Sequence, residues 1–288
     1  MKKGWLLVNG FLQSRKFNEL YRFFLENAAS FDAEISVVTA DGLLAEATDD
    51  FSQWQKPDFV LFWDKDVCLA KRLEKNGFKL FNSASTVEIC DSKTLTATTL
   101  AGKVPIPKTL FSPKTFTAVG YTNLNFVEKA AEILGLPMVI KESYGSFGQQ
   151  VYLAKTLQQA KEIASSLAGK DFVMQRFVAE SCGRDVRLNV VGGKVVNAVL
   201  RKSNGDFRSN VTLGGGMEKY SPTPQEIALA EKTCRILGAD FAGVDVLQGK
   251  EGPLLCEVNS NLHFKSTFDC TGVDISKHIL QHVVNNVG

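Results

Sequence analysis

Short apolar runs alternate with amphipathic segments over residues 1–85, and this alternation constrains the fold more than any other feature. The apolar runs are Trp5–Val8, Ile35–Thr39, Phe59–Trp63 and Lys79–Phe81. Hydrophobic residues at helical spacing lie between them, over 16–29 and 66–76. Strands that alternate with helices usually form a parallel sheet covered by those helices. We therefore predict a parallel α/β domain at residues 1–88.

The rest of the chain changes from mixed elements to mostly strands. Helices are predicted at 92–101, 124–135 and 157–168, and strands at 138–141 and 151–153. From Phe172 onward strands dominate, with one helix among them and one helix at the end of the chain. We expect a central domain at 89–171 and a C-terminal domain built on an antiparallel sheet at 172–288. The overall class is α/β (α+β).

Composition limits the kinds of partner. The formal net charge is +2, so a bulk electrostatic attraction to nucleic acid is excluded. No window of about 18 apolar residues stands in the chain, so we expect no membrane span. The six cysteines lack Cys-x-x-Cys spacing and are interpreted as free thiols in a reducing compartment. We expect a cytoplasmic protein.

Two polar side chains end an apolar strand near the C-terminus. A predicted hairpin of Phe241–Leu247 with Leu254–Asn259 would place Asp245 opposite Glu257. Asn259 shares the face of Glu257, because side chains alternate along a strand. Opposed carboxylates repel unless a cation lies between them, and Mg²⁺ or Mn²⁺ prefers such oxygen ligands. The alternative is that one carboxylate pairs with a lysine and the other faces water.

A loop of small residues follows the strand Met138–Lys141. Gly or Ser stands at positions 143, 145, 146 and 148, so backbone N–H groups there could approach phosphates closely. Lys141 could place its ammonium group on a phosphate. The sequence is not a Walker A motif, because no Gly-Lys-Ser/Thr follows. A plain flexible turn is the alternative.

Two further segments carry polar groups in a regular pattern. Asp185, Arg187 and Asn189 share one face of a predicted strand whose other face is apolar. Three cations, Arg201, Lys202 and Arg208, then gather within residues 201–210. Arginines of this kind can stabilise a transferring phosphoryl group. A solvent-facing sheet and a solvated loop are the alternatives.

The order of these features resembles the ATP-grasp superfamily, and within it the RimK-like carboxylate–amine ligases of the alpha-L-glutamate type. The resemblance covers about residues 91–288 and is weak over 1–85. Its most specific segments are Gly205–Asn210, Ala242–Asp245, Glu257–Asn259 and Thr271–Ile275. It implies an N-terminal α/β domain, a central lid and a C-terminal domain, with ATP held between the last two.

The resemblance also implies which residues form the site. The residues expected to bind the nucleotide are Lys93, Lys141, Gly145, Ser146, Gln175, Arg176, Phe177, Asp185, Arg208, Ser209 and Asn210. Arg201 and Arg208 would offset charge on the transferring group. Asp245, Glu257 and Asn259 would hold two Mg²⁺ or Mn²⁺ ions.

The implied activity is that of an ATP-dependent ligase that forms a C–N bond. A carboxylate would be activated as an acyl phosphate and then joined to an amine, with release of ADP and phosphate. The amine could belong to an amino acid, a peptide or the C-terminus of a small carrier protein, and homo-oligomerisation is left open. The alternatives are a non-catalytic ATP-binding regulatory protein and an ATP-grasp ligase of a non-peptide metabolite.

One segment departs from the glutamate-adding members of the family. They often have Ser/Thr-Pro-Gly and then glutamates after the position of Asn259, where this chain has Ser260–Ser266. That segment resembles ligases that act on an amino-group carrier protein in lysine biosynthesis, which argues against glutamate as the substrate. His263, Phe264 and Lys265 are the candidates for acceptor recognition.

Overall fold

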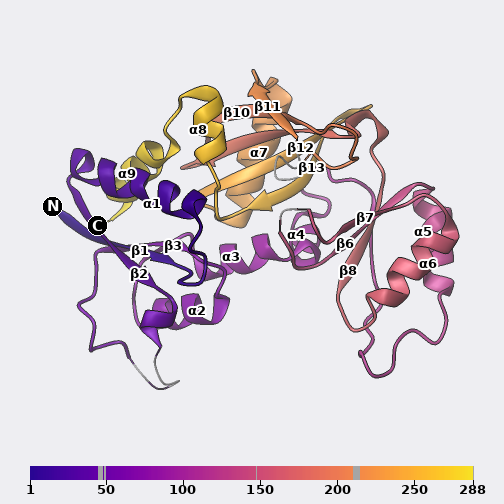
Figure 1. Cartoon of the computed structure of the whole chain (residues 1–288), viewed down its shortest axis with the longest axis horizontal. Coiled ribbons are helices and arrows are strands. Elements are labelled where there is room, and N and C mark those ends of the chain that lie inside the picture. Colours follow the sequence, from indigo (N-terminus) through magenta and orange to yellow (C-terminus); the bar gives the residue numbers. More distant parts are fainter. Residues whose placement is uncertain (45–47, 49, 147, 210–214, 288) are drawn as a thin grey trace.

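The strands of the chain form three sheets arranged along the long axis of the molecule (Figure 1). The computed structural model describes residues 1–44, 48, 50–146, 148–209 and 215–287. The N-terminal sheet lies at one end, a central sheet at the other, and the C-terminal sheet between them. Within these ranges, no helix has the length and apolar character needed to cross a membrane.

The N-terminal sheet is parallel, as predicted. Its strands are β1 (Lys2–Val8), β2 (Ala33–Thr39), β3 (Phe59–Trp63) and β4 (Leu80–Phe81), in the order β2-β1-β3-β4. The chain leaves β1 toward β2 but leaves β3 toward β4. The two connecting helices, α1 (Arg15–Asn27) and α2 (Val67–Lys75), therefore cover opposite faces, and their apolar residues lie in separate cores. Short 3₁₀ turns, η1 (Ala28–Phe31) and η2 (Asp41–Leu43), flank β2.

The central sheet is antiparallel and carries both of its larger helices in one core. Its strands are β5 (Thr109–Phe111), β6 (Met138–Glu142), β7 (Val151–Ala154) and β8 (Phe172–Arg176), in the order β5-β8-β6-β7. The helices are α5 (Asn125–Leu134) and α6 (Leu157–Ser166), and they pack on β6 and β8. The boundary that we expected after residue 171 falls just before β8. This sheet therefore extends to Arg176, beyond that boundary.

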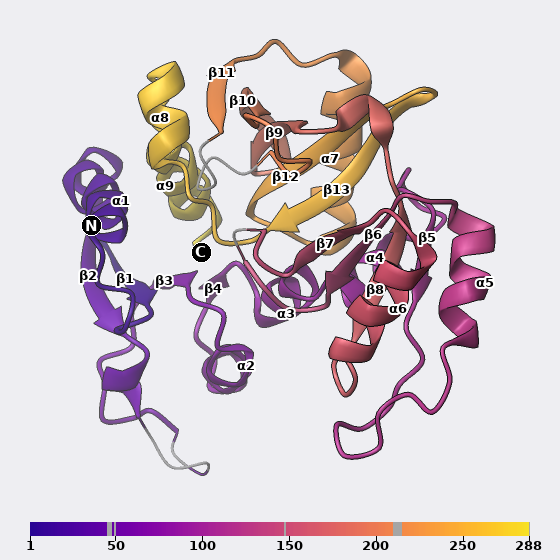
Figure 2. The same cartoon turned by 45° about the vertical axis from the view of Figure 1, so that its right-hand side comes forward.

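The C-terminal sheet is antiparallel and has helices on both faces. After η3 (Ala179–Ser181) come β9 (Arg184–Val191), β10 (Lys194–Lys202), β11 (Gly216–Lys219), β12 (Phe241–Gly249) and β13 (Gly252–Asn259). They lie in the order β11-β10-β9-β12-β13. One face packs on α7 (Pro224–Leu237), α3 (Ala84–Asp91) and α4 (Lys93–Leu100). On the other face lie α8 (Lys265–Thr271) and α9 (Ile275–Asn286), also seen beside α1 in Figure 2.

Two helices differ from expectation. α3 precedes the predicted helix at 92–101, and Ser92 separates it from α4 with extended backbone angles and caps α4 through its hydroxyl. α8 begins within the segment Ser260–Ser266 that we expected to be a loop. At α4 the Ser92 cap decides the structure, and at α8 the packing of Phe268 on Phe23 does so, rather than hydrophobic periodicity.

Aromatic residues from the C-terminal part close the core of the N-terminal domain. Phe264 is fully buried, with ring centroids 5.6 and 5.7 Å from those of Phe23 and Phe24. Trp63, the last residue of β3, stacks on Phe241, the first residue of β12, at 5.3 Å. The expectation that Phe264 recognises an acceptor was therefore wrong, because its ring lies in a shared core.

Asn82 fixes the N-terminal sheet against β12. It follows β4 and is fully buried. Its Nδ2 donates to the carbonyls of Phe241 and Ser260, at 2.9 and 3.2 Å, and its Oδ1 accepts from the backbone N–H of Asp240 at 2.7 Å. All three bonds reach backbone groups of the C-terminal domain, so the amide ties the two domains together.

We predict that Phe264→Ala will lower the free energy of unfolding by about 3–5 kcal/mol, because it empties the core between the domains. Denaturant unfolding followed by fluorescence measures the change. The control is Phe116→Ala, since the Phe116 side chain is 70% exposed and its loss should change stability by less than about 0.5 kcal/mol. Equal effects of the two substitutions would show that Phe264 is not a structural anchor.

Candidate active site

The predicted pairing of Asp245 with Glu257 is confirmed. The two residues lie opposite each other in the β12–β13 ladder. The register then shifts, so that Val246 pairs with Leu255 and Cys256 is an extra residue on β13. Because of this bulge, Cys256 and Glu257 both line one cavity, although neighbouring residues on a regular strand face opposite ways.

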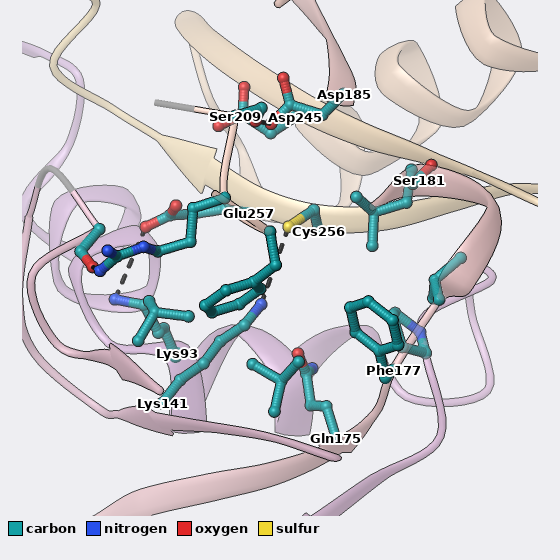
Figure 3. Close-up of a pocket in the computed structure, with 18 of the residues that line it drawn as sticks. Lys93, Lys141, Gln175, Phe177, Ser181, Asp185, Ser209, Asp245, Cys256 and Glu257 are labelled. Carbon is teal, nitrogen blue, oxygen red and sulfur yellow. Dashed lines mark hydrogen bonds and ion pairs between the residues drawn. The ribbon is translucent and has the colours of Figure 1, made fainter. Parts of the chain in front are cut away.

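This first cavity lies between the central and C-terminal sheets (Figure 3). It brings together the sequence-predicted nucleotide residues that the structure describes. These are Lys93, Lys141, Gly145, Ser146, Gln175, Arg176, Phe177, Asp185, Arg208 and Ser209, with Arg201, Asp245 and Glu257 beside them. Asn210 lies outside the described residues.

Two lysines extend from one side of the cavity toward β13 (Figure 3). Lys93 is the first residue of α4, and its Nζ lies 3.6 Å from Glu257 Oε1 and 3.3 Å from the carbonyl of Gly145. Lys141 on β6 is 9% exposed, and its Nζ lies 3.7 Å from Cys256 Sγ. No carboxylate among the described residues forms an ion pair with Lys141. A buried ammonium group without a counter-charge is costly, so this position suits an anionic ligand.

The loop of small residues is held over the cavity from several directions. Ser143 contacts the start of α4, through its hydroxyl to Ser92 at 2.8 Å and through its carbonyl to the N–H of Lys93 at 2.8 Å. Lys65 of the N-terminal domain donates to Ser146 Oγ at 3.1 Å. Arg208 donates to the carbonyl of Gly148 at 2.6 Å. The loop therefore joins all three sheets at the cavity.

Two arginines and two aspartates form a buried network in the wall between β9, β10 and β12. Arg187 makes two hydrogen bonds to Asp245, at 2.5 and 2.6 Å, and Arg201 makes two to Asp185, at 2.6 and 2.5 Å. Arg201 also lies 2.9 Å from Asp245. Burial alone would raise the pKa of Asp245, but Arg187 and Arg201 hold it below its usual value. The network therefore keeps Asp245 ionised.

Asp185 is buried, and both of its carboxylate oxygens already accept hydrogen bonds. Besides Arg201, it accepts a hydrogen bond from Ser209 Oγ at 2.5 Å. Burial lowers the pKa of Arg201, but the charges of Asp185 and Asp245 outweigh it and raise that pKa. Asp185 thus fixes Arg201 in the cavity wall, and its contact with a nucleoside stays a prediction.

The oxygen donors of Asp245, Glu257 and Asn259 fit a hard divalent cation in kind. All three side chains line a second cavity, and Asn259 Nδ2 is buried without a hydrogen-bond partner among the described residues. Within the same ranges, no group of three His, Cys, Asp or Glu residues could hold a metal alone. Water or phosphate oxygens would have to complete the coordination, as is usual for Mg²⁺.

The segment Gln175–Phe177 joins the central and C-terminal sheets. Gln175 donates from its side chain to Thr109 at 2.9 Å, and the backbone N–H of Arg176 donates to the carbonyl of Lys108 at 2.9 Å. The Arg176 guanidinium binds carbonyls at the end of α5. These bonds fix the end of β8. Phe177 is the first residue after β8 and lines the first cavity.

The second cavity lies between the N-terminal and C-terminal domains. It shares Asp245, Glu257, Gly145 and Ser146 with the first cavity. Its other polar lining includes Asn9, Lys16, Asp64, Lys65, Arg187, Asn261 and His263. Burial first, and then the charges of Lys16, Arg187 and Lys65, lower the pKa of His263 to about 4. His263 is therefore neutral at physiological pH. Lys265, another candidate for acceptor recognition, pairs with Asp269 at 2.6 Å.

Sequence reasoning did not single out several of these residues. Asn9 and Asp64 each follow an apolar strand, a signal that could have placed both at the carboxyl end of the sheet. Lys16 gave no such signal, because a lysine at the start of a helix usually faces solvent. Cys256 was hidden by the bulge, since strict alternation turns it away from Glu257.

Comparison with known proteins agrees with this architecture. A family model described as a RimK-like ATP-grasp domain matches residues 91–283. Beta-citrylglutamate synthase B of Danio rerio is 33% identical over 226 residues, which cover 77% of this chain and 54% of that protein. The probable alpha-L-glutamate ligase of Trichodesmium erythraeum (strain IMS101) is 40% identical over 157 residues, covering 54% of this chain and 52% of that protein. The chain thus spans about half the length of these curated relatives.

A solved structure extends the likeness to the N-terminal domain. The RimK domain ATP-grasp protein of Sphaerobacter thermophilus DSM 20745 superposes with a TM-score of 0.73 at 21% identity. The superposition covers 98% of this chain and 99% of that one, so the whole chain has the ATP-grasp fold. With the family model matched over the lid and the C-terminal domain, the chain belongs to the RimK-like ATP-grasp family.

Proposed function

We propose that the protein is an ATP-dependent ligase that joins a carboxylate to an amine through an acyl phosphate. The observation that carries the proposal is the meeting of two cavities at Asp245 and Glu257. The first cavity has lysines suited to phosphates, and the second is open to a different molecule. A phosphoryl group at the shared wall would be within reach of both. Its donor and acceptor could thus bind at the same time.

The first cavity would hold ATP. Apolar side chains of Val139, Val178 and Leu247 would enclose the adenine, and the backbone of Phe177 would contact its edge. Lys141 and Lys93 would contact the phosphates, since both ammonium groups extend toward β13. Gly145 and Ser146 of the loop would cover the phosphates and exclude water, which would otherwise hydrolyse the acyl phosphate.

ATP-grasp proteins use ATP together with divalent metals. We infer that Asp245, Glu257 and Asn259 hold Mg²⁺ or Mn²⁺, as two ions. The metal, when bound, supplies positive charge to the phosphate oxygens. The chain itself adds Arg201 and Arg208, which also line the first cavity. Arg208 is anchored by Asp206 at 2.7 Å, so its guanidinium is oriented before any substrate binds.

The second cavity would bind the carboxylate that is activated. Lys16 and Arg187 line it: Lys16 would supply positive charge where an anionic substrate enters, and Arg187 would offer a guanidinium that is already oriented by Asp245. A carboxylate oxygen attacks the γ-phosphorus, the bond from phosphorus to the ADP oxygen breaks, and ADP leaves. The arginines and lysines offset the charge on the transferring group. An amine then attacks the acyl carbon and phosphate leaves.

The names of the relatives suggest where to look for substrates. One relative is named for β-citrylglutamate and another for an α-L-glutamate ligase. We propose that this chain also joins a polycarboxylate or peptide carboxylate to an amino acid. Glutamate is included among the amines, although the segment after Asn259 differs from the glutamate-adding pattern.

Turnover is the direct test of this proposal. The protein is incubated with Mg-ATP, a set of di- and tricarboxylates and the common amino acids, and the mixture is analysed by mass spectrometry. We expect ADP, phosphate and a new amide in equal amounts. Tight ATP binding with no ADP from any pair of substrates would contradict the proposal and favour a non-catalytic ATP-binding protein.

We predict that Lys141→Met will weaken ATP binding by about 10- to 100-fold, because it removes a charged donor to a phosphate. Stability should stay the same or rise, since the buried ammonium group has no carboxylate partner. Calorimetric titration and thermal unfolding measure the two effects. The control is Lys170→Met, which removes an exposed lysine paired with Glu142. Loss of stability with unchanged ATP affinity would contradict the assignment.

We predict that Glu257→Gln will lower the rate of ADP formation by about 100-fold or more, because it removes a carboxylate from the shared wall. The fold should tolerate the change within about 1 kcal/mol, since this side chain is 33% exposed and lies 3.6 Å from Lys93. Steady-state kinetics and denaturant unfolding check both statements.

Glu251→Gln at the tip of the β12–β13 hairpin is the matched control for Glu257→Gln, and it should keep full activity. Retention of most activity in Glu257→Gln would remove this residue from the proposed metal site. Asp245→Asn is a poorer test, because it would leave Arg187 without its buried counter-charge and Arg201 with Asp185 alone.

A further inference from the structure

Asp64 lies at the carboxyl ends of β1 and β3, where the strand order of the parallel N-terminal sheet reverses. Val8 and Trp63 are paired at the ends of β1 and β3, so Asn9 and Asp64 follow them side by side. The helices after these strands go to opposite faces of the sheet, because β1 leads to β2 and β3 leads to β4. The crevice outside such strand ends is the usual ligand site of an open parallel sheet. Both residues line the second cavity there.

One oxygen of Asp64 is left without a donor. Asp64 is 6% exposed, and its Oδ1 accepts from the backbone N–H of Lys65 at 2.6 Å and from Asn9 Nδ2 at 3.4 Å. Its Oδ2 is buried and has no hydrogen-bond partner among the described residues. A buried carboxylate oxygen in that state is costly unless a ligand supplies a donor.

Lys65, the cation next to Asp64 in the sequence, does not neutralise it. The Lys65 side chain turns away and contacts Asp91 and Ser146. Burial raises the pKa of Asp64, an effect that its hydrogen bonds from Lys65 and Asn9 only partly oppose. A carboxyl group with a raised pKa is a better proton acceptor than an ordinary aspartate.

The other acids of the cavity are already engaged. Asp245 is held by Arg187 and Arg201, Asp91 by Lys65, and Glu257 faces Lys93. Among the described carboxylates that line the cavity, Asp64 is thus the one with a buried oxygen that lacks a hydrogen-bond donor. Its position in the N-terminal domain is also outside residues 91–283, which match the family model.

We propose that Asp64 binds the ammonium group of the acceptor substrate and takes its proton, an inference that rests on the proposed ligase function. The ammonium group donates a hydrogen bond to Asp64 Oδ2 and transfers one proton to it. The freed lone pair forms the C–N bond to the acyl carbon, and the C–O bond to phosphate breaks. Phosphate leaves with the electron pair of the broken C–O bond, and it takes the second proton that the amine nitrogen loses.

The test separates activation of the carboxylate from attack by the amine. Hydroxylamine is largely unprotonated at neutral pH and traps acyl phosphates as hydroxamates, so it does not need Asp64. Wild type and Asp64→Asn are compared with Mg-ATP and citrate, or whichever carboxylate gives the most ADP, first with hydroxylamine and then with L-glutamate and the other common amino acids. Hydroxamate and amide are measured by mass spectrometry.

In Asp64→Asn we expect hydroxamate formation within about twofold of wild type, and amide formation lowered by about 100-fold. Asp64→Glu, which keeps a carboxylate, should recover part of the amide rate. Asp66→Asn is the matched control and should behave as wild type within about twofold, because Asp66 caps α2 by accepting from the N–H of Leu69 at 2.9 Å, as asparagine also can, and its charge contributes less than burial to the raised pKa of Asp64.

Three outcomes would overturn the inference. Asp64→Asn could form amide at the wild-type rate, or it could lose hydroxamate and amide equally. Wild type could also form hydroxamate that no amino acid diverts to amide, which would mean that the cavity takes no ammonium group. A wild-type protein that forms no hydroxamate with any carboxylate would instead overturn the proposed function itself.

Discussion

The site depends on the buried ion pairs that join β9, β10 and β12. Arg187, Arg201, Asp185 and Asp245 neutralise one another in a wall that solvent hardly reaches. Removing one member would leave an unpaired buried charge, which costs several kcal/mol. The same contacts hold Asp245 ionised and fix it where the two cavities meet. Substrate binding on either side therefore meets a wall whose charge and shape are already set.

The rest of the fold brings two other surfaces to this wall. The loop of small residues after β6 reaches it through Ser92, Lys65 and Arg208, which hold its carbonyl and hydroxyl groups. The N-terminal domain reaches it through Asn82 and through the aromatic core around Phe264. Ligand sites between domains are common because several elements can each supply one group. Here the first and second cavities have otherwise different linings and share Gly145, Ser146, Arg201, Asp245 and Glu257.

The sequence predicted the parallel sheet, the β12–β13 register and the gathering of polar groups in the first cavity. The sheet follows from alternating elements and the register from a short hairpin, whereas the gathering of the site residues was implied by the resemblance to the ATP-grasp ligases. The bulge at Cys256 could not be predicted, because it depends on the ladder geometry. Burial of Phe264 was missed because its aromatic partners are distant in sequence. The second cavity needs side chains from both ends of the chain, which no local pattern relates.

We propose that Asp245, Glu257 and Asn259 gather around a metal-bound nucleotide. A crystal structure with a non-hydrolysable ATP analogue and Mn²⁺, with anomalous scattering to locate the ion, measures this directly. We predict an anomalous peak in contact with oxygens of these side chains and with phosphate oxygens, beneath the loop of Gly145 and Ser146. A nucleotide bound in the first cavity with no ion near β12 and β13 would contradict it.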